Sequence, residues 1–188
     1  LSAGALIVLS PTLLIMAIAI KLSSPGPVLF RQWRYGRNGV PFRIYKFRTM
    51  RTDACDPTGV RQVTAGDPGV TPLGQFMRSR SLDELPQLFN VLSGDMSLVG
   101  PRPHAIGMKA AGVLYEELVP YYALRHAVRP GLSGWAQANG LRGPTTEAQC
   151  SRSRIDHDLA YIQNQSLALD IKIIWMTIRS EFLAGSGS

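Results

Sequence analysis

The chain is poor in the residues that build disulfide or metal frameworks. It has two cysteines in 188 residues, Cys55 and Cys150, and neither lies in a Cys-x-x-Cys or Cys-His spacing. This pattern argues against a structural disulfide or zinc site and is typical of a reducing compartment. The three histidines lack the spacing of metal ligands. A glycine-rich loop of Walker type and a Gly-x-Ser-x-Gly motif are also missing, which argues against a conventional kinase or ATPase.

Acidic residues are absent from the first 52 positions, which carry eight Lys and Arg. The remainder has 12 basic and 13 acidic side chains, so the net charge of +7 arises entirely before Asp53. A basic patch can bind nucleic acid. A basic patch next to an apolar segment, however, more often faces anionic lipid or an anionic substrate. The sequence therefore predicts no nucleic-acid partner.

Residues 1–22 form an apolar run with a single charge, Lys21. About 20 apolar residues are enough to cross a bilayer as a helix. Pro11 removes one helical hydrogen bond and kinks the helix, while the hydroxyl of Ser10 can bind a freed carbonyl. A kinked helix that spans the membrane and a helix that breaks at Ser10-Pro11 and returns are both open. On the residues alone the spanning helix is favoured, with the basic run from Arg31 on the cytoplasmic side.

The rest of the pattern predicts an α+β fold that is mostly helical. Two strands, at 28–32 and 42–47, flank an Asn-Gly turn and predict a short β-hairpin. Residues 53–72 are rich in Asp, Gly, Pro and Thr and predict a surface loop. A loop with a short strand is expected over 129–140. Helices are expected at 73–80, 82–92, 104–118, 147–164 and 167–183.

The expected helix at 167–183 has a broad apolar face that includes Leu167, Ile171, Trp175 and Ile178. Such faces usually belong to a protein core. With Trp175 and a cationic residue close by, the same face is also suited to lie flat in a membrane interface as an amphipathic helix. The sequence leaves both interpretations open.

The adjacent carboxylates Asp83 and Glu84 lie between a basic cluster and the Gly-Pro-Arg-Pro turn that carries Arg102. Acidic residues often begin helices, and Ser81 with Glu84 three residues on predicts a capping box. A nucleophile beside a metal ligand, with arginines around both, is also what chemistry on a phosphate group needs. The functional interpretation draws on further polar residues, namely Lys46, Arg48, Arg78, Arg102, Arg129 and Asp158.

Four ordered motifs decide between these interpretations. They are Lys-Phe-Arg-Thr-Met at 46–50, Ser-Leu-Asp-Glu-Leu-Pro-Gln at 81–87, Gly-Asp-Met-Ser-Leu-Val-Gly-Pro-Arg-Pro at 94–103 and Arg-Pro-Gly at 129–131. In this order they resemble the bacterial sugar transferases, the monotopic phosphoglycosyl transferases. The resemblance covers nearly the whole chain. It implies transfer of a sugar 1-phosphate from a UDP-sugar to undecaprenyl phosphate, with release of UMP.

The resemblance also implies roles for individual residues. Asp83 would attack the sugar-proximal phosphorus and form an acyl-phosphate enzyme, Glu84 would hold Mg²⁺, and polyprenyl phosphate would then displace Asp83. The cations would neutralise phosphate charge, with Arg102 kept in place by its flanking prolines. The family match places Lys46, Arg78, Arg102, Arg129 and Asp158 around this site.

In this family the membrane helix breaks at a Ser-Pro pair, here Ser10-Pro11, and re-enters the same leaflet. The resemblance thus reverses the preference for a spanning helix. It implies a re-entrant membrane helix at 1–22 and a cytoplasmic catalytic domain at 23–188, on the inner face of the bacterial cytoplasmic membrane and in contact with membrane lipids. Because the chain starts inside that helix without the usual preceding basic stretch, we expect it to be part of a longer protein.

The sugar is less well defined by the sequence. Residues 134–143 resemble the version in hexose-1-phosphate transferases that begin exopolysaccharide repeats, which favours UDP-glucose and leaves galactose open. The residues expected near the sugar or uridine are Trp135, Gln137, Asn139 and Arg142. A homodimer stays open, as does a second function, a non-catalytic membrane-anchored module that binds lipid or a partner. The intact set of Asp83, Glu84 and Arg102 favours the enzyme.

Overall fold

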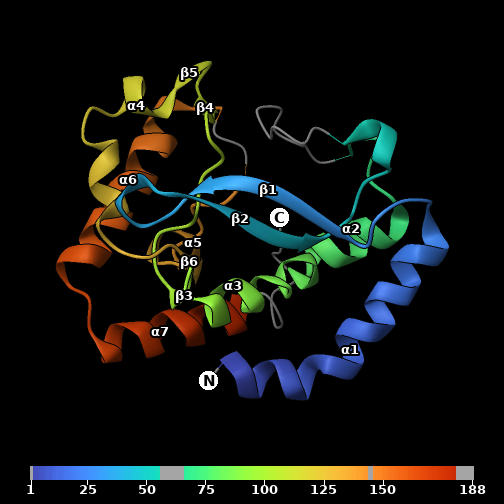
Figure 1. The fold of residues 1–188 in the computed structure, drawn as a ribbon. Helices are drawn as coiled ribbons and strands as arrows, with labels where there is room; N and C mark the ends of the chain where they lie inside the picture. The colour runs from blue at the N-terminus through green and yellow to red at the C-terminus, as the bar shows by residue number, and fades with distance from the viewer. Residues whose placement is uncertain (1, 56–65, 144–145, 181–188) are drawn as a thin grey trace.

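A computed structural model describes residues 2–55, 66–143 and 146–180 (Figure 1). It confirms a mostly helical α+β fold with a short β-hairpin. The helices are α1 (Ser2–Ser23), α2 (Pro72–Ser79), α3 (Gln87–Ser93), α4 (Tyr115–Leu118), α5 (Trp135–Ala138), α6 (Ala148–Gln163) and α7 (Leu167–Ile178). The strands are β1 (Leu29–Tyr35), β2 (Pro41–Phe47), β3 (Ser97–Val99), β4 (Lys109–Ala110), β5 (Val113–Leu114) and β6 (Gly131–Ser133).

Helix α1 is the one helix in the described ranges that is long and apolar enough to cross a membrane. Pro11 lies inside it and cannot donate to the carbonyl of Ile7, four residues earlier. The Ser10 hydroxyl donates to that carbonyl at 2.8 Å, so the freed group is satisfied without water. The ribbon of α1 also changes direction along its length (Figure 1). A break at Ser10-Pro11 and a re-entrant path stay predictions.

The second half of α1 packs into the fold. Ile20 forms a buried cluster with Phe47 of β2 and Met77 of α2. The other side of the helix exposes large apolar side chains, among them Ile7 and Leu14. A contiguous exposed apolar face of this kind indicates contact with a membrane or a partner, and with the length of α1 it suggests a membrane location.

The hairpin forms as predicted, with longer strands. Strands β1 and β2 pair antiparallel from Leu29 opposite Phe47 to Tyr35 opposite Pro41. At the turn, Asn38 and Gly39 have φ values of 56° and 73°, the left-handed conformation that Asn-Gly adopts at low cost. Successive strand residues point to opposite faces, so residues two positions apart share a face. Lys46 and Arg48 therefore lie on the same side of β2 and its continuation.

The predicted helix at 82–92 is confirmed only from residue 87 onward, and its predicted capping box is wrong. Residues Leu82–Glu84 form a 3₁₀ turn, and α3 begins only at Gln87, after Pro86. Ser81 has a φ of 52° and makes no capping hydrogen bond with its side chain. An N-cap needs an extended backbone, so a left-handed Ser81 cannot fill that role. The Asp83-Glu84 pair therefore lies in the 3₁₀ turn before α3 and not in a regular α-helix.

The predicted helix at 104–118 is wrong except at its end. Residues 109–114 form the two-stranded β4–β5 hairpin, and only the four residues of α4 are helical. Gly107, Ala111 and Gly112 have φ values of 72°, 51° and 86°, which a right-handed helix excludes. Gly107 lies in the turn before β4, whereas Gly112 shares the hairpin turn with Ala111, which adopts its positive φ at a steric cost.

Strands β3 and β6 pair in parallel and bring the Gly-Pro-Arg-Pro and Arg-Pro-Gly motifs together. The Gly131 N–H donates to the Pro101 carbonyl at 2.9 Å. A Cβ at Gly131 would lie 2.1 Å from the amide nitrogen of Gly100, so only glycine allows the two chains to approach this closely. The segment that carries Arg102 is thus attached to a second motif 30 residues further on.

Helices α6 and α7 confirm the two last predicted helices, although residues 181–183 of the second lie outside the described ranges. In α7, Ile173 is fully buried against Val99 and Tyr161, whereas Leu167, Ile171 and Trp175 are exposed. One side of α7 therefore belongs to the core and the other is free. Half of the expected loop at 53–72 lies outside the described ranges, and its first residues belong to a 3₁₀ turn, Thr52–Ala54.

Candidate active site

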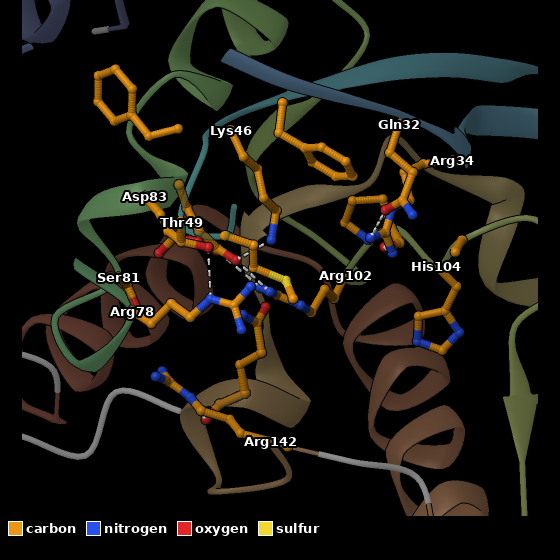
Figure 2. Close-up of a pocket in the computed structure, with 18 of the residues that line it drawn as sticks. Gln32, Arg34, Lys46, Thr49, Arg78, Ser81, Asp83, Arg102, His104 and Arg142 are labelled. Carbon is orange, nitrogen blue, oxygen red and sulfur yellow. Dashed lines mark hydrogen bonds and ion pairs between the residues drawn. The ribbon is translucent and has the colours of Figure 1, made fainter. Parts of the chain in front are cut away.

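A cavity of about 720 Å³ lies between the hairpin, α2, the Leu82–Glu84 turn and the Arg102 segment, with α5 and α6 completing its wall. Its side chains are shown in Figure 2. In that view Asp83, Lys46 and Arg78 lie toward one end and Arg34 and His104 toward the other, with Arg102 between the two groups. Elements far apart in the sequence therefore build one polar pocket.

Glu84 is the centre of the ion pairs in this cavity. Lys46 of β2 donates to Glu84 Oε1 at 2.7 Å, and Arg102 donates to Oε2 at 3.1 Å and also to Oε1. Burial alone would raise the pKa of Glu84, but Arg102 and Lys46 outweigh it and hold that pKa well below its ordinary value. Glu84 is therefore a carboxylate that stays charged.

The pKa of Asp83 is shifted in the opposite direction. It is buried, and this burial raises the pKa of its carboxyl above the ordinary value of 3.8, although Lys46 opposes the shift and Glu84 adds to it. Of the two carboxyls, Asp83 takes up a proton first while Glu84 stays ionised. Two carboxyls whose environments separate their pKa values in this way commonly divide the chemical work of an active site.

Three basic side chains surround the dyad. The Arg78 Nε donates to the Thr49 hydroxyl at 2.8 Å, which fixes its guanidinium next to Asp83 at one end of the cavity (Figure 2). Burial lowers the pKa of Lys46 against the attraction of Glu84. Arg102 exposes 37% of its side chain, compared with 18% for Lys46. The site thus combines a buried carboxyl with a cationic wall, as binding a diphosphate requires.

Arg48 lines the cavity, but its guanidinium points to the end of α1. It donates to the carbonyl of Pro25 at 2.6 Å and to that of Ser24 at 2.7 Å. These two carbonyls belong to the turn after α1, and the same guanidinium also donates at 3.5 Å to the carbonyl of Ile20 in the last turn of the helix. These contacts support a role for Arg48 in tying the apolar helix to the hairpin rather than in binding phosphate.

The structure separates the other predicted site residues into two groups. Gln137 and Arg142 line the cavity, and among the residues that the structure describes the buried side-chain oxygen of Gln137 has no hydrogen-bond partner. Arg129 and Asn139 are exposed, and with Trp135, which packs near α7, they are not among the cavity-lining residues. Asp158 lines the cavity, where it is buried and paired with a residue that the sequence did not single out.

That residue is Arg125, whose guanidinium donates to Asp158 Oδ2 at 2.6 and 2.9 Å. Sequence reasoning also missed Arg34 and His104, which line the cavity. Burial, and then the charge of Arg102, lower the pKa of Arg34 to about 10. The predicted strand ended at residue 32. Had it been extended to residue 34, the two-residue spacing of Gln32 and Arg34 would have placed both side chains on one face.

No group of three His, Cys, Asp or Glu side chains that could hold a metal ion occurs in the part of the chain that the structure describes. The acidic groups at this end of the cavity are Asp83 and Glu84. This donor set fits Mg²⁺, which is commonly bound by one or two carboxylates together with phosphate oxygens of a substrate. It does not fit a metal held by protein side chains alone.

Comparison with known proteins gives a family for this arrangement. A model of the bacterial sugar transferase family matches residues 1–184. The exopolysaccharide production protein PSS of Rhizobium leguminosarum bv. phaseoli is 55% identical over 186 residues, which are 99% of this chain and 93% of that protein. The UDP-glucose:undecaprenyl-phosphate glucose-1-phosphate transferase of Escherichia coli (strain K12) is 49% identical over 95% of this chain and 38% of its own length.

A relative with a different sugar in its name is nearly as similar. The UDP-N-acetylgalactosamine-undecaprenyl-phosphate N-acetylgalactosaminephosphotransferase of Aeromonas hydrophila is 46% identical over 179 residues, which are 95% of this chain and 41% of that protein. The chain therefore spans well under half the length of these two named transferases. Similarity of this degree does not separate one sugar from another.

Proposed function

Because the chain belongs to the bacterial sugar transferase family, we propose that it transfers a hexose 1-phosphate from a UDP-sugar to undecaprenyl phosphate and releases UMP. The observation that carries this proposal is the buried Asp83 beside an ionised Glu84, inside a cavity lined by Lys46, Arg78 and Arg102. A module that only binds lipid or a partner does not need this combination of groups. Such a module is the alternative that the assay below excludes or supports.

In the first step, an oxygen of the Asp83 carboxylate attacks the sugar-bearing phosphorus of the UDP-sugar. A new P–O bond forms to Asp83, the bond to the bridging oxygen breaks, and that oxygen keeps the electron pair and leaves as UMP. Lys46, Arg78 and Arg102 are placed to neutralise the charge that gathers on the phosphate oxygens. Because the phosphate leaving group is a stable anion, this step requires no general acid.

In the second step, a phosphate oxygen of undecaprenyl phosphate attacks the same phosphorus. The bond to Asp83 breaks, the carboxylate is regenerated, and the sugar phosphate is now carried by the lipid in a diphosphate linkage. The cavity is suited to a lipid substrate because its wall includes Phe47, whose ring also packs against Ile20 of the apolar helix. Phe47 thus connects the wall of the cavity with the apolar helix.

We assign Glu84 as the protein ligand of Mg²⁺. When bound, this ion neutralises the diphosphate of the nucleotide sugar. Arg102 and Lys46 hold the pKa of Glu84 below its ordinary value, so Glu84 is ionised near neutral pH, as a metal-binding carboxylate must be. Its present partners Lys46 and Arg102 are themselves able to bind phosphate oxygens, so they keep a counter-charge when a substrate and its metal enter.

The proposal also covers the sugar and the location. UDP-glucose is the favoured donor, in line with the names of several relatives that are about half identical. We place residues 23–188 at the cytoplasmic face of the bacterial inner membrane, anchored by a re-entrant α1 that breaks at Ser10-Pro11. The hydrogen bond from Ser10 to Ile7 supports such a break because it lets the chain bend without an unpaired carbonyl in lipid.

The decisive assay measures UMP. Purified protein in nanodiscs is incubated with undecaprenyl phosphate, Mg²⁺ and, in separate reactions, UDP-glucose, UDP-galactose and the two N-acetylated UDP-hexosamines. We expect release of UMP, fastest with UDP-glucose and suppressed by EDTA. Without the lipid, a two-step reaction gives at most one UMP per protein molecule. Absence of UMP with every UDP-sugar would refute the enzymatic function.

The path of α1 is tested by labelling. Single cysteines are introduced near Gly4 and at Ser24, in a background that lacks Cys55 and Cys150, and intact cells or spheroplasts are treated with a membrane-impermeant maleimide. We expect no label at either position until the membrane is opened, because both ends of a re-entrant helix face the cytoplasm. Labelling at one end from outside would show a spanning helix instead.

The rate of UMP release is predicted to depend on pH through two groups. Asp83 attacks as a carboxylate, and burial raises its pKa. On acidification the rate should therefore begin to fall at a higher pH than it would with an aspartate of ordinary pKa. Lys46 acts as an ammonium, and burial lowers its pKa from 10.5, so the rate also falls earlier on the alkaline side. In Lys46→Arg the alkaline decline should move upward, because arginine stays protonated. An unchanged alkaline decline would assign it to another group.

A further inference from the structure

The segment that carries Arg102 has an unusual set of main-chain contacts. The four consecutive carbonyls of residues 101–104 each accept a hydrogen bond, and the donors come from three other parts of the fold: β1, the 3₁₀ segment Tyr122–Ala127 and β6. The donors are the Gly131 N–H at 2.9 Å, the Arg125 guanidinium at 2.7 Å, the Arg34 guanidinium at 3.3 Å and the Tyr35 N–H at 3.1 Å. Because Pro101 and Pro103 have no N–H and a restricted φ, these carbonyl contacts determine the path of the segment.

The donor to the Arg102 carbonyl is half of a buried ion pair. The side chains of Arg125 and Asp158 are 1% and 2% exposed. The Arg125 Nε and Nη2 both donate to Asp158 Oδ2, and the same Nη2 donates to the Arg102 carbonyl. Arg125 also lies over the ring of Tyr122, 5.4 Å from its centre. Asp158 thereby orients Arg125, and Arg125 reaches a catalytic segment that is 23 residues away in the sequence.

Burying two charges costs free energy, and an ion pair in a core is often no more stabilising than well-packed apolar residues. A buried pair that also binds the backbone of a functional residue has a second use. Arg102 is partly exposed and long, so its guanidinium meets Glu84 in one place only if its Cα is held still. The main-chain contact from Arg125 provides that constraint from the inner side of the segment.

We propose that Arg125 and Asp158 form a positioning unit that fixes Arg102, through its main-chain carbonyl, where its guanidinium pairs with Glu84. Neither residue bonds to a substrate in this role. The effect of this unit on catalysis rests on the proposed sugar-phosphate transfer. Its effect on the position of the Arg102 segment does not. The role also accounts for Asp158, which the family resemblance implied at the site but whose carboxylate is paired with Arg125.

The first test reads the position of the segment without any assay of activity. Hydrogen exchange of the peptide 99–108 is measured by mass spectrometry in the full chain, in nanodiscs, for wild type, Arg125→Met and Asp158→Asn. We expect faster exchange in this peptide for both variants. Ile155→Ala is the matched control, because Ile155 lies on the same helix as Asp158, is fully buried and contacts an apolar cluster. It should lower the melting temperature without faster exchange at 99–105, the part of the peptide before Met108, which packs against the same cluster as Ile155.

The second test is a double-mutant cycle on UMP release. Arg125→Met should lower kcat about 10- to 100-fold in the wild-type background, the loss typical of a misplaced catalytic group. In an Arg102→Ala background the same change should cost less than about 2-fold, because the group it positions is gone. Arg125→Lys keeps one donor and should recover part of the rate. If Arg125→Met lowers kcat by the same factor in both backgrounds, the pair acts independently of Arg102.

The two readouts separate this inference from the proposed function. If wild-type protein releases no UMP from any UDP-sugar, the proposed function fails, and the exchange experiment still decides whether the pair holds the Arg102 segment. Unchanged exchange in Arg125→Met, or equal exchange in Ile155→Ala, overturns the positioning role even if the enzyme is active. Should Arg125→Met fail to fold, Arg125→Lys and Asp158→Asn carry both measurements.

Discussion

Asp83→Asn should lower UMP release by at least about 10⁴-fold, because a carboxamide cannot attack phosphorus as a carboxylate does and removal of a nucleophile costs losses of this order or more. The fold should not suffer. Burial raises the pKa of Asp83 above its unfolded value, so near neutral pH the charged carboxylate opposes folding, and a neutral side chain of the same shape removes this cost. We therefore expect a melting temperature equal to or above that of wild type.

The measurement pairs the kinetic assay with intact-protein mass spectrometry after incubation with UDP-sugar in the absence of lipid. Wild type should gain the mass of one hexose phosphate, and Asp83→Asn should gain none. Asp95→Asn is the control, since it makes the same change at an exposed carboxylate outside the lining of the cavity. Activity of Asp83→Asn within 10-fold of wild type would assign the nucleophile to another group.

Local patterns predicted the elements that local interactions determine. Asn38-Gly39 specifies the turn of the hairpin, and Thr71, whose hydroxyl accepts from the Gly74 N–H, caps the predicted helix α2. The first part of the helix predicted at 82–92 and most of the helix predicted at 104–118 failed for a common reason. Apolar spacing favoured a helix, but the backbone is left-handed at Ser81 and at Ala111, and apolar periodicity does not register a single left-handed residue.

The same distinction holds for the site. Asp83, Glu84, Lys46, Arg78 and Arg102 were predicted from motifs and do line one cavity. The positioning residue Arg125 was missed because its role depends on a contact with Asp158, 33 positions away. No local sequence pattern predicts that an arginine is buried. The contacts of Arg48 with the end of α1 were missed for the same reason, because charge alone does not tell a phosphate ligand from a helix cap.

Glu84→Gln is the second substitution with a large expected effect, a loss of about 10²- to 10³-fold in UMP release, similar to the removal of one strong electrostatic contact in a transition state. Glutamine keeps the shape but not the charge. Lys46 and Arg102 then face each other in a buried site without their common anion, and the pKa of Lys46 loses the attraction that opposes the effect of burial. Unlike Asp83→Asn, this variant should also melt at a lower temperature.

The sign of that stability change follows from the pKa of Glu84. Its cationic partners hold it below the ordinary value of 4.5 in the folded state, so ionised Glu84 stabilises the fold at every pH above that value, and the contribution is lost only as the pH falls toward the lowered pKa. Glu84→Gln removes it, and the melting temperatures of variant and wild type should converge in acid. Glu147→Gln, at an exposed carboxylate, is the control and should change neither activity nor melting. If Glu84→Gln melts like wild type at pH 7 and keeps its Mg²⁺ dependence, Glu84 neither anchors the two cations nor binds the metal, and the division of work between the two adjacent carboxyls is wrong.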